Sequence, residues 1–357
     1  MRRLDVIFLG FGNVGSTLLR QVLETREVLA SRAGVYIVPI ALADISGILY
    51  DERGLSEEAL RAALQARAGG RLLESLPGIL PPDEVRSILR PGAILADLTA
   101  SPHTAPILRA ALDIGCGLVL ANKIPLAEPW EDARVFFEHP KVRYEVTVGA
   151  GLPVIATLNY LLDTGDQVTA IEGCMSGTLG YLCAELERGT PYSVAVNRAR
   201  ELGYTEPDPR DDLSGTDVMR KALILARTAG WPLEQENLAI EALYPRELAT
   251  VAVDEFLVAI SSLDGEYAAR RARAWSEGNV LRYVARVTPQ AGMVGLMPVP
   301  RENVISMLRG PGNYIAFYTT RYNEVPLAIA GPGAGREVTA AGVLGDIIEL
   351  GKAMYGQ

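Results

Sequence analysis

The chain has 357 residues, which is too long for one ordinary hydrophobic core and predicts two or three packed units. Hydrophobic residues at 49% and charged residues at 22% are typical of a soluble globular protein. A net charge of −9 without a long run of Lys or Arg argues against a nucleic-acid partner. No apolar segment approaches the ~18 residues that a membrane span needs, so no membrane partner is expected either. The three cysteines, Cys116, Cys174 and Cys183, are odd in number and lie in apolar contexts, which predicts core residues in a reducing, cytoplasmic setting.

A glycine-rich turn, GFGNVG at residues 10–15, follows the first apolar run, residues 4–9. After a strand and before a helical pattern, the spacing GxGxxG indicates a dinucleotide-binding turn. Gly10 permits the tight turn, Gly12 lets the backbone approach a pyrophosphate, and Gly15 lets the helix pack closely on the strand. The alternative is an ordinary strand–turn–helix whose glycines serve turn geometry alone.

Asp44 ends the second predicted strand, residues 36–43. An acid at this place accepts hydrogen bonds from the ribose hydroxyls and disfavours a 2′-phosphate, so Asp44 weakly favours NAD over NADP. Its distance from Gly15 is longer than the usual ~20 residues, and Asp44 also suits the start of a turn, DISG.

Two further predicted strands carry small polar residues and a lysine at their ends. Residues 93–98 lead into Thr99 and Ala100, and residues 117–120 lead into Lys123. Because nucleotides bind where parallel strands end, these residues are candidates for a cofactor crevice. A solvated lysine after a strand is the alternative for Lys123.

Beyond residue 150 the alternation of strand and helix gives way to a mixed pattern. The expected fold class is α/β, with a Rossmann-type parallel sheet in residues 1–150 and an inserted α+β domain in residues 151–312. Strands near 314–320 and 327–330, then a glycine turn and a final helix, predict that residues 313–357 return to the first domain.

An acidic stretch, LGYTEPDPRDDLSGTDVMRK at residues 202–221, precedes a strongly apolar helix. Its two prolines predict an extended loop, and Ser214 with Asp217 predicts the start of the helix. Asp217 and Lys221 are four residues apart and therefore share one face of that helix. An exposed ion pair of about 0.2–0.5 kcal/mol is one interpretation. Because charges at the head of a buried helix are costly without a partner or a task, we favour a functional site.

The motifs together resemble the homoserine dehydrogenase family over nearly the whole chain. The matching blocks, in the family's order, are GFGNVG at 10–15, ANK at 121–123, YEVTVGAGLPVI at 144–155, SGTLGY at 176–181, the acidic stretch at 202–221, and GPGAGREVTAAGVLGDII at 331–348. The resemblance implies interconversion of L-homoserine and L-aspartate 4-semialdehyde with NAD or NADP, in threonine and methionine biosynthesis. It also implies a short form without an ACT regulatory domain.

The resemblance assigns roles to particular residues. Lys221 would be the proton donor, with Asp217 beside it and Lys123 near the reacting oxygen. Substrate contacts would come from Thr178, Tyr204, Glu206, Asp212, Asp217 and Lys221. The cofactor would be lined by Gly12, Asn13, Val14, Thr99, Ala100, Lys123 and Gly335, in addition to Gly10, Gly15 and Asp44 from the pattern itself. A sodium-type monovalent cation would be bound by backbone oxygens of Glu145, Val148, Ala150 and Leu152.

The resemblance further implies a homodimer formed through the inserted substrate and dimerisation domain. Two positions depart from the family pattern. Ile124 stands where a second lysine is common, which puts one cofactor phosphate contact in doubt, and Gly180 stands where Asn or Ser is common.

Two other functions compete with this interpretation. A related amino-acid semialdehyde dehydrogenase shares the fold, although none of the three cysteines lies in a convincing nucleophile turn. A non-catalytic dinucleotide sensor is expected to lose Lys221 or Asp217 first, and both are present. The sequence leaves open the preference between NAD and NADP, feedback regulation, the cation and the direction of the reaction.

Overall fold

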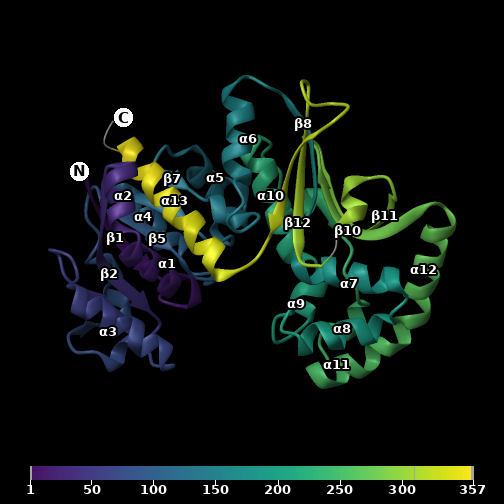
Figure 1. Ribbon diagram of the computed structural model, residues 1–357, viewed down its shortest axis with the longest axis horizontal. Coiled ribbons are helices and arrows are strands. Elements are labelled where there is room, and N and C mark those ends of the chain that lie inside the picture. The colour runs from purple at the N-terminus through teal and green to yellow at the C-terminus, as the bar shows by residue number, and fades with distance from the viewer. Residues whose placement is uncertain (1, 309, 355–357) are drawn as a thin grey trace. The chain divides into compact units, whose positions relative to one another are not determined.

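The computed structural model describes residues 2–308 and 310–354 and divides into two compact units (Figure 1). The first unit holds the chain up to Gly151 and again from Gly335, and the second holds Leu152–Ala334. The expected α/β class with an inserted second unit is confirmed. In the described part of the chain, no helix combines the length and the apolar character needed to cross a membrane.

The first unit is built on a seven-stranded sheet in the order β4-β3-β2-β1-β5-β6-β7. Neighbours from β2 to β7 pair in parallel, and β3 and β4 are antiparallel additions at one edge. The strands are β1 (Arg2–Leu9), β2 (Val35–Asp44), β3 (Gly47–Tyr50), β4 (Ile79–Leu80), β5 (Ile94–Asp97), β6 (Gly117–Leu120) and β7 (Val142–Arg143). The α-helices are α1 (Asn13–Glu24), α2 (Arg26–Ala33), α3 (Glu57–Ala68), α4 (Ala105–Ile114), α5 (Trp130–Glu138) and α13 (Arg336–Met354).

The core of this unit explains why the chain returns to it. In Figure 1, α13 (yellow) lies beside α1 (purple). Val343, Ile347 and Leu350 of α13 are fully buried in one cluster with Phe8 and Leu18. Burial of such side chains contributes about 1.5–3 kcal/mol each, so the last helix is an integral part of the first unit.

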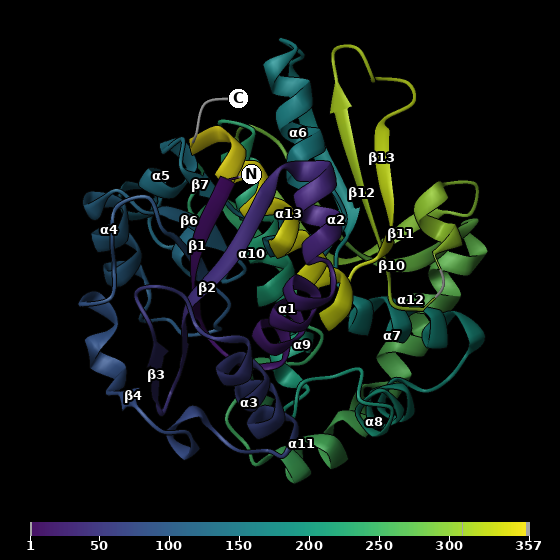
Figure 2. The ribbon, with the colours of Figure 1, turned by 60° about the vertical axis from the view of Figure 1, so that its left-hand side comes forward.

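The second unit contains a six-stranded sheet in the order β13-β12-β8-β10-β11-β9. Figure 2 shows β12 and β13 side by side at one edge. All neighbours are antiparallel except β11 and β9. The strands are β8 (Val168–Cys174), β9 (Leu238–Ile240), β10 (Asn279–Val287), β11 (Gly292–Pro300), β12 (Gly312–Thr319) and β13 (Leu327–Pro332). The α-helices are α6 (Val154–Asp163), α7 (Gly177–Arg188), α8 (Tyr192–Glu201), α9 (Arg210–Leu213), α10 (Thr216–Thr228), α11 (Val253–Ala259) and α12 (Asp264–Ser276).

The boundary expected at residues 312 and 313 is wrong, because the chain re-enters the first unit only at Gly335. β12 pairs with β8 in the middle of the second sheet, with Tyr314 opposite Cys174, and β13 pairs with β12. β12 is hydrogen-bonded to β8 and therefore lies within the second sheet. Of the helices and strands after residue 312, only the final helix, α13, belongs to the first unit.

The acidic stretch also differs from its expected conformation. Arg210–Leu213 forms a short helix, α9, where an extended loop was predicted. The next helix, α10, begins at Thr216, and its N-cap is Gly215, which has φ 74°. Ser214, predicted to start this helix, lies one residue before the N-cap. Proline is compatible with the first turn of a helix, and Pro209 occupies the N-cap of α9.

Candidate active site

The glycine turn after β1 is shaped by close contacts within the first unit. A Cβ on Gly10, which has φ 107°, would lie 2.9 Å from the backbone of Leu98, and one on Gly15 would lie 2.3 Å from the Gly10 carbonyl oxygen. A Cβ on Gly12 would meet nothing within 4 Å. Contacts within the protein therefore require glycine at Gly10 and Gly15, and none within the described residues requires it at Gly12.

A hollow of about 460 Å³ lies at this turn, over the ends of β1, β2 and β5. Five of the predicted cofactor residues line it: Gly10, Gly12, Asp44, Thr99 and Ala100. Asn13 lines a neighbouring hollow, whereas Val14 and Gly15 pack inward and line neither. Gly335 and Lys123 are also absent from the lining of both hollows.

Both interpretations of Asp44 are present in its geometry. The residue lines the hollow, and it also starts the turn to β3, because its Oδ1 accepts hydrogen bonds from the backbone N–H and the hydroxyl of Ser46 at 2.8 and 2.6 Å. Its Oδ2 accepts from the Leu73 N–H at 2.9 Å. A carboxylate has about four acceptor positions, so about one remains for a ribose hydroxyl.

The neighbouring hollow, of about 580 Å³, is basic, and sequence reasoning missed its charged residues. Arg20, Arg67 and Arg336 line it together with Asn13 at the start of α1. Arg67 also lines the first hollow, and its guanidinium donates to Asn13 Oδ1 at 3.3 Å. Three guanidinium groups beside a helix N-terminus suit a phosphate-bearing ligand. The arginines come from three helices, so no local motif could have revealed them.

A buried polar network supports the floor of the first hollow. Asp97, at the end of β5, accepts hydrogen bonds from the Thr99 backbone N–H and hydroxyl at 3.0 and 2.7 Å. The Asn122 amide, after β6, donates to Asp97 at 3.2 Å and to the Ser101 carbonyl at 2.8 Å, and its oxygen accepts from the Ile124 N–H. Burial raises the pKa of Asp97.

This network fixes the two segments that hold Thr99 and Lys123. The single Thr99 hydroxyl proton goes to Asp97, and the same oxygen accepts from the Ser101 N–H at 3.2 Å and faces the Asn122 amide at 3.3 Å. Its hydrogen-bonding capacity is therefore used inside the protein, and any ligand contact at Thr99 falls to the backbone or the methyl group.

In the second unit the head of α10 carries the predicted lysine. Lys221 Nζ lies 2.7 Å from Asp217 Oδ2 and donates to the Met175 carbonyl oxygen at 2.7 Å. The Lys221 side chain is 11% exposed and that of Asp217 44% exposed. An ammonium has three donors, so these two contacts leave one for a further acceptor. The carbonyl of Met175 was missed by sequence reasoning, because only the tertiary fold brings the end of β8 to α10.

The remaining predicted substrate residues gather around Thr178 at the start of α7. Thr178 Oγ1 lies 2.6 Å from the Tyr204 carbonyl oxygen and 2.9 Å from Asp212 Oδ1. Asp212 Oδ2 accepts from the Glu206 N–H at 2.8 Å. Burial raises the pKa of Asp212, and the nearby carboxylates of Glu206 and Asp217 add to the rise. The side chains of Tyr204 and Glu206 are exposed. Four predicted substrate residues, Thr178, Tyr204, Glu206 and Asp212, are therefore joined by hydrogen bonds. The Asp217–Lys221 pair acts on this group through the charge of Asp217.

The four residues predicted to bind a cation lie on both sides of the unit boundary. Glu145, Val148 and Ala150 belong to the first unit, and Leu152 is the first residue of the second. Ala150 has φ 54°, a conformation that costs a non-glycine residue about 1–3 kcal/mol and tends to occur at ligand sites. The backbone N–H of Glu145 is held at 2.9 Å by Asp346 of α13. Two of the four carbonyl oxygens also accept backbone hydrogen bonds, Glu145 from the Val148 N–H at 3.4 Å and Leu152 from the Val154 N–H at 2.8 Å.

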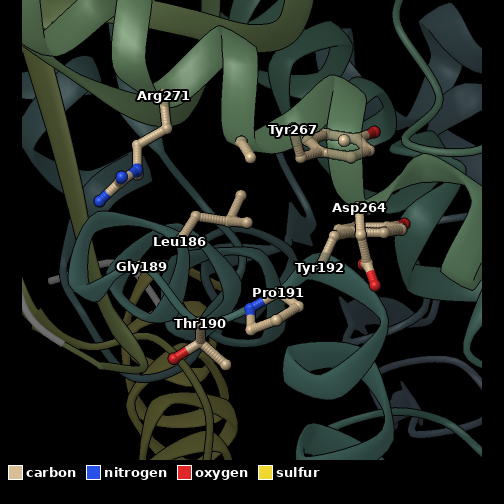
Figure 3. A pocket seen from close by; sticks show the side chains of 10 residues that line it. Leu186, Gly189, Thr190, Pro191, Tyr192, Asp264, Tyr267 and Arg271 are labelled. Atoms are coloured by element: carbon tan, nitrogen blue, oxygen red, sulfur yellow. The ribbon is translucent and has the colours of Figure 1, made fainter.

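A further hollow in the second unit, of about 330 Å³, contains none of the predicted residues (Figure 3). It lies where the end of α7 meets the starts of α8 and α12, and Asp264 and Arg271 face it. The Asp264 carboxylate already accepts from the N–H and hydroxyl of Ser193, which makes it a cap of α8.

The fold and these clusters define a two-unit dehydrogenase architecture, in which a dinucleotide-type sheet is joined to a mixed unit that carries a lysine and several carboxylates. The family model of homoserine dehydrogenase matches residues 153–348. The chain belongs to the homoserine dehydrogenase family, as the sequence predicted.

Individual relatives agree with this membership. The chain is 38% identical to bifunctional aspartokinase/homoserine dehydrogenase 2 of Zea mays, over 97% of this chain and 38% of that protein. It is 40% identical to the homoserine dehydrogenase of Emericella nidulans, over 76% of this chain and 80% of that one. A crystal structure of a Candida auris protein of unknown function, 32% identical, has a TM-score of 0.85 over 98% of both chains. The chain spans about two fifths of the length of the bifunctional relatives that it matches.

Proposed function

We propose that this chain catalyses the NAD(P)-dependent interconversion of L-homoserine and L-aspartate 4-semialdehyde, a step of threonine and methionine biosynthesis. The observation that carries the proposal is the buried Lys221 ammonium, which is held by Asp217 and the Met175 carbonyl and has one donor left. Membership in the family supports the same reaction.

The proposed chemistry needs little from the protein beyond binding and proton transfer. The nicotinamide cofactor supplies or takes up the hydride at the carbonyl carbon. When the aldehyde is reduced, the new alkoxide must gain a proton, which Lys221 donates while Asp217 stabilises its charge. In the oxidative direction a neutral Lys221 accepts the hydroxyl proton. Lys123 would lie near the reacting oxygen. Carboxylates suit the substrate's ammonium group, and Glu206 and Asp212 are proposed to bind it together with Thr178 and Tyr204.

One assay tests the proposal. Oxidation of NADPH and of NADH is followed with aspartate semialdehyde for the parent, for Lys221→Ala and for Arg220→Ala, a neighbouring cation of the same helix. We expect Lys221→Ala to lose roughly 10²- to 10⁴-fold in kcat, and Arg220→Ala to remain close to the parent. If the parent turns over neither cofactor, the enzyme proposal fails. If the parent is active and Lys221→Ala is equally active, only the role of Lys221 fails.

For the cofactor, we propose a dinucleotide seated at Gly10, Gly12, Asn13, Thr99 and Ala100, with Val14, Gly15, Lys123 and Gly335 around it. Asp44 favours NAD, whereas Arg67 offers a cation to a 2′-phosphate from the same hollow. We expect Arg67→Ala to raise KM for NADP more than KM for NAD, because only NADP carries the extra phosphate. Equal changes in the two KM values would contradict a phosphate contact at Arg67.

We further propose a sodium-type cation at the backbone of Glu145, Val148, Ala150 and Leu152, and a homodimer formed through the second unit. A cytoplasmic location is proposed from the odd number and the burial of the cysteines. The related semialdehyde dehydrogenases and the dinucleotide sensor are not favoured, since the family is that of homoserine dehydrogenase and Lys221 and Asp217 are paired. The family match supports the chemistry, and sedimentation measurements would test the dimer.

A further inference from the structure

The hydroxyl of Thr178 stands between two oxygen atoms that both lie within hydrogen-bonding distance. The Tyr204 carbonyl oxygen is 2.6 Å away and Asp212 Oδ1 is 2.9 Å away. A threonine hydroxyl has one proton, and a carbonyl oxygen can only accept. With an ionised Asp212, the one Thr178 proton would have to be shared between both acceptors in a three-centre bond, which weakens each contact. Each contact has a proton of its own when Thr178 donates to Tyr204 and a proton on Asp212 Oδ1 is donated to Thr178.

We propose that Asp212 is a neutral carboxylic acid in the ligand-free protein and that it releases its proton when the ammonium group of the amino-acid substrate binds. The inference rests on the proposed function for the identity of the substrate. It assigns Asp212 a coupled role, as a hydrogen-bond donor to Thr178 before binding and as the counter-charge of the ammonium afterwards.

The surroundings of Asp212 support a proton there. Glu206, from the preceding loop, and Asp217, from α10, are carboxylates whose charges disfavour a third ionised carboxylate. Lys221, one of the cations of α10, is already bonded to Asp217 and to the Met175 carbonyl. The Glu206 N–H at 2.8 Å, a hydrogen bond from Thr178 and the N-terminus of α7 favour the ionised form and oppose this effect. Burial acts in the direction of the neutral acid and raises the pKa of Asp212.

The proton balance of the proposed step is simple. Before binding, Asp212 carries one proton and the substrate arrives as an ammonium ion. After binding, the carboxylate of Asp212 pairs with the intact ammonium, and the proton of Asp212 passes to solvent. Thr178 then donates to only one of its two acceptors, and no covalent bond to the substrate forms or breaks.

Infrared difference spectroscopy tests the proton directly, without relying on catalysis. Parent protein at about pH 6 is compared with Asp212→Asn, and with Asp211→Asn as an exposed control in the same helix. Asp346, whose pKa is raised to about 8, contributes a carboxylic-acid carbonyl band in all three proteins, so the spectrum of each variant is subtracted from that of the parent. We expect a difference band, the Asp212 band, for Asp212→Asn and none for Asp211→Asn. A band of equal area in all three proteins overturns the proposal. If Asp212→Asn does not fold, Thr178→Val replaces it, with a shifted band expected and an unshifted band as the refutation.

Addition of L-homoserine tests the release of the proton. We expect the Asp212 band to disappear at saturation. We also expect KM for homoserine to rise roughly 10- to 100-fold in Asp212→Asn, and the pH dependence of KM to flatten in that variant. An Asp212 band that persists at saturating homoserine overturns the release. A protein that turns over homoserine but lacks the Asp212 band refutes the proton while the proposed function stands. A protein with the Asp212 band but without turnover refutes the function and leaves the proton in place.

Discussion

The buried carboxyl of Asp346 in α13 makes the stability of the first unit depend on pH. Its Oδ2 accepts the Glu145 N–H at 2.9 Å, and the residue is 5% exposed. Burial raises the pKa of Asp346 to about 8, the charges of Glu145 and Glu349 add to the rise, and Arg143 opposes it. The perturbation we consider is Asp346→Asn, which keeps an oxygen acceptor for the N–H and removes the titration.

The magnitude follows from the two pKa values of the same group. A carboxyl whose folded pKa is raised stabilises the native state below its unfolded pKa of about 4, and this contribution is lost as pH rises towards 8. The loss is about 1.4 kcal/mol per pH unit, or roughly 4 kcal/mol between pH 4 and pH 7 as an upper limit. Asparagine does not titrate, so its contribution to stability does not change with pH. We therefore expect Asp346→Asn to match the parent near pH 4 to 5 and to be more stable by several kcal/mol near pH 8.

The assay is urea unfolding of both proteins at several pH values, at one fixed sodium concentration because Glu145 belongs to the proposed cation site. The difference between the two proteins isolates Asp346, since all other titrations are shared. Glu337→Gln removes an exposed carboxylate of the same helix that does not contribute to the raised pKa of Asp346, so it serves as the control and should follow the parent. A stability difference that does not change with pH would refute the reasoning, and so would a variant that becomes less stable as pH rises.

Two glycine substitutions test close contacts in the two units. In Gly15→Ala the methyl group would lie 2.3 Å from the Gly10 carbonyl oxygen, so we expect a loss of about 1–3 kcal/mol and weaker binding in an NADPH fluorescence titration. A variant with the parent's melting temperature would contradict this contact. In Gly333→Ala the methyl would lie 1.8 Å from Cγ of the fully buried Asn313, with a similar expected cost. The Asn313→Ala background should relieve most of that cost in thermal unfolding, and strictly additive losses would show that the two residues do not interfere.

Local features of this protein follow from the sequence because short-range sterics determine them. The turn at residues 10–15 depends on contacts between neighbours such as Gly10 and Gly15, so its spacing predicted both the turn and the hollow beside it. Asp217 and Lys221 are one helical turn apart, which was sufficient to predict their ion pair. Long apolar strands followed by helical patterns likewise predicted the parallel sheet.

Other features depend on pairings between distant segments, which no local pattern contains. β12 joins the second sheet because β8, about 140 residues earlier, offers it an unpaired edge, and this decided where the chain returns to the first unit. The arginines of the basic hollow come from α1, α3 and α13. The acidic stretch at residues 202–221 supplies the charges, but Thr178 and the Met175 carbonyl reach it only through the fold. The sequence determined which chemical groups are present, and the tertiary structure decided which of them share a hydrogen bond and therefore a proton.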